Sequence, residues 1–191
     1  MQSVDYYKSI IKNRLSESRY IHSLNVADSA AELSEIYGCD KEKAYLAGIL
    51  HDITKEEGLD AQYELIERDS HKPTKLERNN PAVIHQMSGE AYCRLELGIT
   101  DEEILSAIRY HTTGKANMTT LQKVVYTADF ISADRNYPDV EEMRSLALKS
   151  LDDAMLYSLK YTITKLASKA ELIHPDSFEC YNSVLENKIK D

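Results

Sequence analysis

Apolar residues recur at helical spacing along almost the whole chain, and alternation of apolar and polar positions is nearly absent. Only six Gly and four Pro interrupt this pattern, which therefore predicts helices joined by connectors and no sheet. The predicted helices run from about Ser18 to Tyr37, Asp40 to Asp52, Asp60 to Arg68, Pro81 to Leu97, Thr100 to His111 and over residues 121–132, with two more, separated by Pro175, in residues 141–191.

Residues with strong helix-end preferences support these boundaries. Gly38 is expected to end the first helix, because glycine readily adopts the left-handed conformation found there. The polar stretch RDSHKPTKLERNNP is interpreted as a connector. The expected N-terminal signals are Asn80 as N-cap with Pro81 at the first helical position, a Thr100–Glu103 capping box, and Thr119 or Thr120 before residues 121–132.

Length and composition are those of an ordinary globular protein. The 191 residues, 42% hydrophobic and 29% charged, suit one all-α domain over 1–191. The N-terminus lacks an apolar signal segment, and no apolar run reaches the roughly 18 residues of a membrane span. We therefore expect a cytoplasmic protein with no membrane partner.

Charge and cysteine content exclude several classes of function. A net charge of −9 argues against nucleic acid or anionic membrane as the main partner, because clustered Lys and Arg bind both. Cys39, Cys93 and Cys180 are far apart and in no CxxC pattern, so neither a disulfide framework nor a thiolate zinc site is indicated. An anionic ligand would need local cations.

Polar residues interrupt apolar helix faces at several points. His22 begins the stripe that continues through Val26, Ala30, Leu33 and Tyr37, and His111 shares a face with Ile104 and Ile108. His51 and Asp52 end a helix whose Ala44, Ala47 and Gly48 would let a neighbouring helix come close. His85 lies on the helix after Pro81, and Asp129 lies one turn beyond Val125. These histidines and carboxylates are expected to face inward.

The inward-facing polar set comprises His22, His51, Asp52, His85, His111 and Asp129. One buried histidine is more often a satisfied core residue than a ligand, and a His-Asp dipeptide often marks a solvated helix end. Six such groups, supplied by successive helices, need partners and are typical of a metal site inside a helical bundle. Six ligands exceed a tetrahedral shell, so we predict two ions, with Asp52 best placed to bridge them.

The ordered set of these residues resembles the HD superfamily of metal-dependent phosphohydrolases, and His85 and His111 resemble its two-metal branch. The segments RYIHSLNVA, AGILHDITK, AIRYHTTG and YTADFISADR together resemble the bacterial YqeK family of symmetrical dinucleoside tetraphosphate hydrolases, and HPDSFECYN extends the similarity towards the C-terminus. One departure is that Ser132 and Ala133 stand where that family is expected to have Glu-Pro before its phosphate-site arginine. The match covers about residues 18–135, the expected metal-binding core; residues 141–191 are expected to be packing helices and to offer a homodimer surface.

The resemblance implies that His22, His51, Asp52 and Asp129 hold one ion, and that His85 and His111 hold the second with Asp52 shared. An imidazole-rich set without thiolates suits iron, manganese, cobalt or nickel, and the family points to iron. The implied reaction is cleavage of diadenosine tetraphosphate to two ADP by a hydroxide between the ions, so a dinucleoside polyphosphate or nucleoside diphosphate is the expected ligand. The alternatives are a nucleotide or deoxynucleotide phosphohydrolase of the same superfamily, and a non-catalytic nucleotide-sensing module.

Further residues could bind the phosphates. Lys55 lies one turn after Asp52 and Arg135 six residues after Asp129, and we expect both to act in catalysis with Asp52, although a solvated helix end would equally explain Lys55. Thr112, Thr113 and Gly114 follow His111 and could donate hydroxyl and backbone N–H groups, although a helix-terminating turn would use the same residues. Arg19, one turn before His22, is a weaker candidate for substrate binding.

Overall fold

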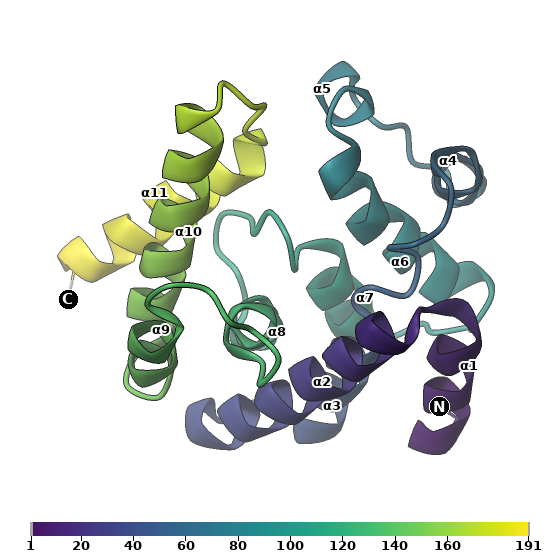
Figure 1. Ribbon diagram of the computed structural model, residues 1–191, viewed down its shortest axis with the longest axis horizontal. Coiled ribbons are helices and arrows are strands. Elements are labelled where there is room, and N and C mark those ends of the chain that lie inside the picture. Colours follow the sequence, from purple (N-terminus) through teal and green to yellow (C-terminus); the bar gives the residue numbers. More distant parts are fainter. Residues whose placement is uncertain (1, 191) are drawn as a thin grey trace.

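The computed structural model describes residues 2–190, which form helices and, within that range, no strand (Figure 1). The all-α prediction is confirmed. The elements are α1 (Val4–Arg14), α2 (Glu17–Tyr37), α3 (Lys41–Leu50), α4 (Leu59–Arg68), α5 (Lys75–Arg78), the 3₁₀ helix η1 (Pro81–Val83), α6 (Ile84–Leu95), α7 (Glu102–Arg109), α8 (Thr120–Ile131), α9 (Val140–Ala147), α10 (Leu151–Ser168) and α11 (Pro175–Lys190).

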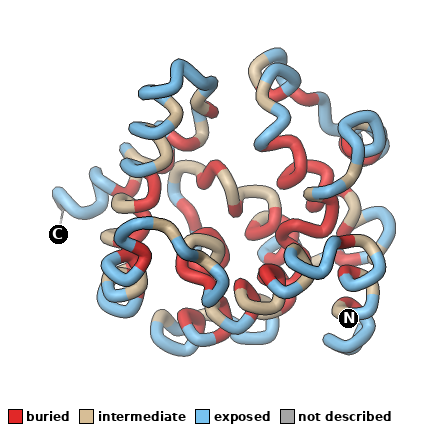
Figure 2. Tube along the Cα trace, viewed as in Figure 1, coloured by how far each residue is buried: buried red, intermediate tan, exposed pale blue. Residues whose placement is uncertain are grey.

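The helices pack around a centre formed by α2, α3, α7 and α8. α2 packs against both α3 and α8, and α7 contacts α3, α6 and α8. In Figure 1, α4–α6 lie on one side of this centre, and α10 with α11 lies on the other, where α10 contacts α8 and α9. Buried residues gather where these helices meet, and exposed residues lie mainly on the outer turns (Figure 2).

α2 and α3 lie unusually close together because α3 presents a small residue to its neighbour. A Cβ added to Gly48 would lie 2.6 Å from the Cα of Ala27, nearer than side-chain carbons approach a backbone. The predicted role of the small residues on α3 is confirmed at this position. α2 also ends as predicted, with Gly38 in the left-handed region at φ 71°. This pairing brings the start of α2 beside the end of α3.

One predicted N-cap is confirmed in position and another is wrong. Asn80 is the N-cap with Pro81 at the first position, but of the 3₁₀ helix η1, which leads into α6 at Ile84, and the Asn80 side chain makes no capping hydrogen bond. Asp101, rather than Thr100, caps α7, because its carboxylate accepts the backbone N–H groups of Glu103 and Ile104. A carboxylate one residue later competes successfully with the threonine hydroxyl for these N–H groups.

Other boundaries differ in ways that short-range patterns do not capture. The connector after α4 contains the four-residue helix α5, and the C-terminal part contains α9 in addition to the two expected helices. The first alternative for α8 is confirmed, since Thr119 forms a capping box with Gln122. None of the helices described here combines the length and apolar character needed to cross a membrane.

Candidate metal centre

The six predicted ligands come together at one point where five segments meet. His22 lies in the second turn of α2, and His51 and Asp52 follow the last residue of α3. His85 lies at the start of α6, His111 two residues after α7, and Asp129 in the last turn of α8. All four imidazoles and the Asp52 carboxylate are buried. Helices distant in sequence thus place their polar side chains in one interior site.

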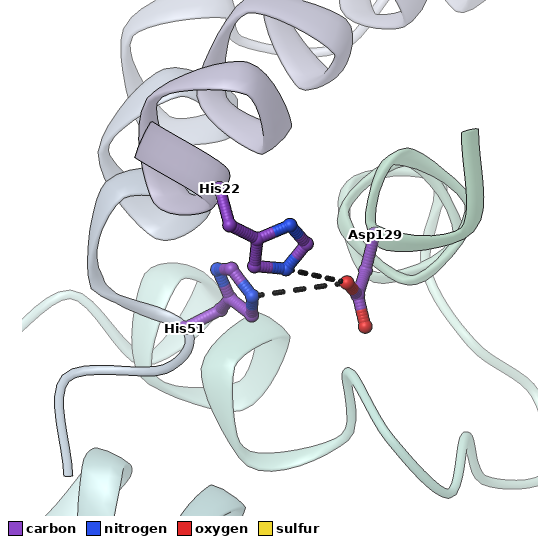
Figure 3. A group of neighbouring side chains, drawn as sticks. All are labelled: His22, His51 and Asp129. Carbon is purple, nitrogen blue, oxygen red and sulfur yellow. Dashed lines mark ion pairs between the residues drawn. The ribbon is translucent and has the colours of Figure 1, made fainter. Parts of the chain in front are cut away.

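The first group of side chains consists of His22, His51 and Asp129, which point toward one another in Figure 3. The Nε2 atom of His22 lies 3.0 Å from Oδ1 of Asp129, and the Nε2 atom of His51 lies 3.9 Å from the same oxygen. The rings of the two histidines meet edge to face, with centroids 5.3 Å apart. Two imidazole nitrogens and one carboxylate oxygen therefore converge.

The second group consists of His85 and His111, whose Nε2 atoms lie 3.0 Å apart. Asp52 lies between this pair and the first group. Its Oδ1 atom is 3.3 Å from Nε2 of His85 and 3.6 Å from Nε2 of His111, whereas its Oδ2 atom is 3.5 Å from Nε2 of His51. The two oxygens of Asp52 thus face different sets of histidines, as a bridging carboxylate requires.

The hydrogen bonds of the histidines show that the site fits metal ions. Nδ1 of His51 donates to the carbonyl of Gly48 at 2.7 Å, and Nδ1 of His111 donates to that of Ile108 at 2.7 Å. Each Nε2 therefore carries a lone pair. Nε2 of His51 is buried without a hydrogen-bond partner among the described residues, although carboxylates lie nearby. A lone pair facing anions needs a cation, and this tautomer is the one that ligates metals.

The electrostatics favour the ligand forms of Asp52, His85 and His111. Burial alone would raise the pKa of Asp52, but the surrounding imidazoles, led by His51, outweigh burial and hold that pKa well below its usual range. Burial and the positive charge of Lys55 lower the pKa of His85 well below its usual value, and burial lowers that of His111. Burial alone would lower the pKa of His51, but the charge of Asp52 outweighs burial and raises it. A metal ion bound at Nε2 of His51 would replace that proton, because ligating imidazoles are neutral and ligating carboxylates are ionised.

All three predicted phosphate-binding cations border the centre. Arg135 forms an ion pair with the Asp129 carboxylate, and its Nε donates to the Asp129 carbonyl at 2.6 Å. Arg19 donates to Oδ2 of Asp52 at 2.8 Å. Nζ of Lys55 lies 3.1 Å from Nε2 of His85, and burial lowers its pKa. The structure places all three cations at the site, and their contact with phosphate stays a prediction.

In the loop after α7, one threonine borders the metal centre and the next is buried in the protein core. The Thr112 hydroxyl lies 2.9 Å from Nε2 of His111, so it borders the ligands. The Thr113 hydroxyl is buried and donates instead to the carbonyl of Gly114 at 2.9 Å. Gly114, at φ 66°, has no room for a Cβ because Sγ of Cys180 would lie 2.6 Å away. Thr112 is therefore the best placed of these residues to meet a ligand.

Asp134 is a residue of the site that sequence reasoning did not identify. Its Oδ2 atom lies 2.8 Å from Nδ1 of His22, and its Oδ1 atom accepts a hydrogen bond from Asn25 at 3.1 Å. The carboxylate therefore holds a proton on Nδ1 of His22 and directs the Nε2 lone pair toward Asp129. The visible signal was an acidic residue next to the predicted Arg135, in the loop where Ser132 and Ala133 replace an expected Glu-Pro.

Comparison with known proteins places this geometry in context. Residues 19–134 match the HD domain family. The chain is 41% identical to a symmetrical bis(5'-nucleosyl)-tetraphosphatase of Bacillus subtilis, covering 90% of this chain and 92% of the relative, and 35% identical to the Staphylococcus aureus protein of the same name, covering 99% of both. It is also similar to a crystal structure of a predicted HD superfamily hydrolase involved in NAD metabolism from Clostridium acetobutylicum, with 34% identity, a TM-score of 0.95, and coverage of 98% of this chain and 99% of that one.

Proposed function

Since this chain belongs to the HD domain family, we propose that its histidine–aspartate centre is the active site for the reaction named in its relatives. The chain is a hydrolase of acid anhydrides that cleaves dinucleoside tetraphosphates symmetrically, so that diadenosine tetraphosphate and water give two ADP. One observation carries the assignment to this site: the two oxygens of Asp52 face two separate groups of histidines. That arrangement suits a pair of ions acting on one phosphate chain.

Two divalent transition-metal ions per chain are proposed for this centre. His22, His51 and Asp129 would hold one, His85 and His111 the other, and Asp52 would contact both. Imidazole and carboxylate donors without thiolates suit iron, manganese, cobalt or nickel, and iron is the first choice from the resemblance to the YqeK family. When bound, such ions supply Lewis acidity toward phosphate oxygens and lower the pKa of water.

The residues of the chain then bind and orient the substrate. Arg135 and Lys55 border opposite ends of the centre, beside Asp129 and His85 respectively, where they can offset the charge that develops on the departing phosphate. The Thr112 hydroxyl next to His111 can donate to a phosphate oxygen. In a chain with a net charge of −9, these groups provide the local positive potential that an anionic polyphosphate needs.

Hydrolysis in ¹⁸O-labelled water tests the reaction. The metal-loaded protein is incubated with diadenosine tetraphosphate in the labelled water. The products are separated by chromatography, and their masses are measured by mass spectrometry. Symmetrical cleavage gives ADP as the sole nucleotide product, with the label in its β-phosphate. AMP together with ATP would overturn the symmetrical reaction. Orthophosphate from mononucleotides, without action on dinucleotides, would favour the alternative nucleotide phosphohydrolase.

A further inference from the structure

A cavity of about 510 Å³ lies beside the metal centre, against one face of α10. Asp129 and Arg135 are among its lining residues, so the cavity adjoins the proposed active site. Its volume is within the range of small-molecule pockets, about 300–1,000 Å³. Residues 141–191, expected to serve packing, thus also supply a wall of a cavity that reaches the metal centre.

Two tyrosines provide an aromatic surface in this cavity. The rings of Tyr137 and Tyr161 are stacked, with centroids 6.0 Å apart and planes 27° apart. The Tyr137 hydroxyl donates to the carbonyl of Phe130 at 3.0 Å, which fixes that ring against α8. Tyr161 is 41% exposed, although it is a large aromatic residue. The Lys165 ammonium lies over the Tyr161 ring, 5.6 Å from its centroid, so a planar ring that enters the cavity stacks on Tyr161 by displacing this flexible side chain.

Cations line the same wall. Tyr161 and Lys165 share one face of α10, and Lys169, four residues further on, is the C-cap residue just past the end of that helix. Both lysines line the cavity with Arg135, and no ion pair within residues 2–190 involves either lysine. Glu171 also lines the cavity and offers an acceptor for hydroxyl groups. The wall thus combines an aromatic face with positive charge that no carboxylate of the described residues neutralises.

A dinucleoside tetraphosphate has a nucleoside at each end, so cleavage at the middle requires one nucleoside diphosphate half to extend to each side of the metal centre. Asp129 and Arg135 of the metal centre and Tyr161 and Lys169 of the C-terminal part line the same cavity. Resting on the function proposed above, we propose that this cavity binds one nucleoside diphosphate half of the substrate. Its phosphates lie along Arg135 and Lys165, and its base stacks on Tyr161.

Stacking also determines which substrates this subsite accepts. Every base has a π-face, so stacking tolerates different bases and favours those that stack strongly. A subsite built on Tyr161 therefore accepts adenine and guanine alike and binds pyrimidines more weakly. The aromatic ring, rather than the hydroxyl of Tyr161, is the recognition element, so Tyr161→Phe should behave like the wild type.

The test uses the full-length, metal-loaded protein and three variants. Tyr161→Ala removes the stacking surface, Tyr161→Phe keeps it, and Phe178→Ala removes an aromatic residue of similar exposure on α11 that does not line the cavity. Calorimetric titration with ADP and steady-state hydrolysis of diadenosine tetraphosphate are measured for each. Tyr161→Ala should raise the ADP Kd and the KM about fivefold to a hundredfold and leave kcat nearly unchanged, since stacking is the same in ground and transition states.

Equal ADP binding by Tyr161→Ala and Phe178→Ala would overturn the subsite. Photo-crosslinking with 8-azido-ADP gives a second readout. Labelled peptides from residues 157–169 support the proposal, and labelling confined to α4–α6 overturns it. Failure of the proposed function is distinguishable, because a wild-type protein that leaves dinucleoside tetraphosphates uncleaved refutes that function, whereas ADP titration and crosslinking still decide whether the cavity binds a nucleotide.

Discussion

Replacing Asp134 should weaken metal binding although this residue is not a proposed ligand. Its carboxylate lies 2.8 Å from Nδ1 of His22, where it fixes the ring and keeps the Nε2 lone pair directed at Asp129. Loss of such a partner costs about 10- to 100-fold in metal affinity, or about 1.4–2.7 kcal/mol. The side chain is 31% exposed, so water can replace part of this hydrogen bond, and we expect about tenfold for Asp134→Ala. Asp134→Asn retains an acceptor and should lose less.

Titration of the metal-free protein with Co²⁺, followed by calorimetry and by the visible spectrum, measures this effect without relying on activity. One of two binding steps should weaken, because His85 and His111 do not contact Asp134. Asp139→Asn is the matched control: it removes one negative charge from the same loop, and Asn tolerates the left-handed conformation found there, φ 67°. If Asp134→Ala binds Co²⁺ as tightly as this control, the argument that Asp134 orients His22 is refuted.

Three further predictions concern the bridge, the α2–α3 contact and acid stability. Asp52→Ala should keep its helical circular dichroism but lose more than about a hundredfold in rate on diadenosine tetraphosphate and bind fewer than two metal ions by elemental analysis; higher residual activity would contradict the assignment. Gly48→Ala should lower the free energy of unfolding by about 1–3 kcal/mol in urea titration, because its Cβ would overlap the backbone of α2; wild-type stability would count against that contact. Burial alone would raise the pKa of Glu77, but hydrogen bonds from Thr74 outweigh it and lower the pKa. A lowered carboxyl pKa adds stability above the unfolded value and loses it as pH falls through the folded one, so Glu77→Gln should flatten the loss of stability below about pH 4.5, whereas the exposed control Glu67→Gln should keep the wild-type slope.

The helices and the proposed ligand set could be predicted because both depend on local patterns. An apolar stripe of period 3.6 fixes which face of a helix is buried, and that face carried His22 and His111 inward. Burial then required these polar groups to have partners. The same reasoning missed α1, α5 and α9; the four residues of α5 are too short to show a period. It placed the α7 cap at Thr100, whereas Asp101 accepts the N–H groups at the start of that helix.

The wall on α10 could not be predicted, because nothing local relates Tyr161 to Arg135. Each residue is ordinary on its own: a tyrosine on a helix surface and an arginine in a loop. They line one cavity only because α10 packs across the end of α8, and that arrangement depends on apolar contacts over the whole C-terminal part. The residues that contact the substrate away from the reacting phosphorus could therefore be identified only from the structure.

Asp134 illustrates a third case, in which the chemistry was expected but its position was not. Ser132 occupies the position where the family resemblance leads us to expect Glu. The absence of that carboxylate raises the question of which residue takes over its role. The chain leaves α8 in an extended conformation at Ser132 and then turns, with the N–H of Arg135 donating to the carbonyl of Ser132 at 2.9 Å. That turn carries Asp134 under the ring of His22, while the adjacent Arg135 reaches Asp129. One loop thus orients a proposed ligand and positions a cation, so a change in its length should impair both metal affinity and substrate binding.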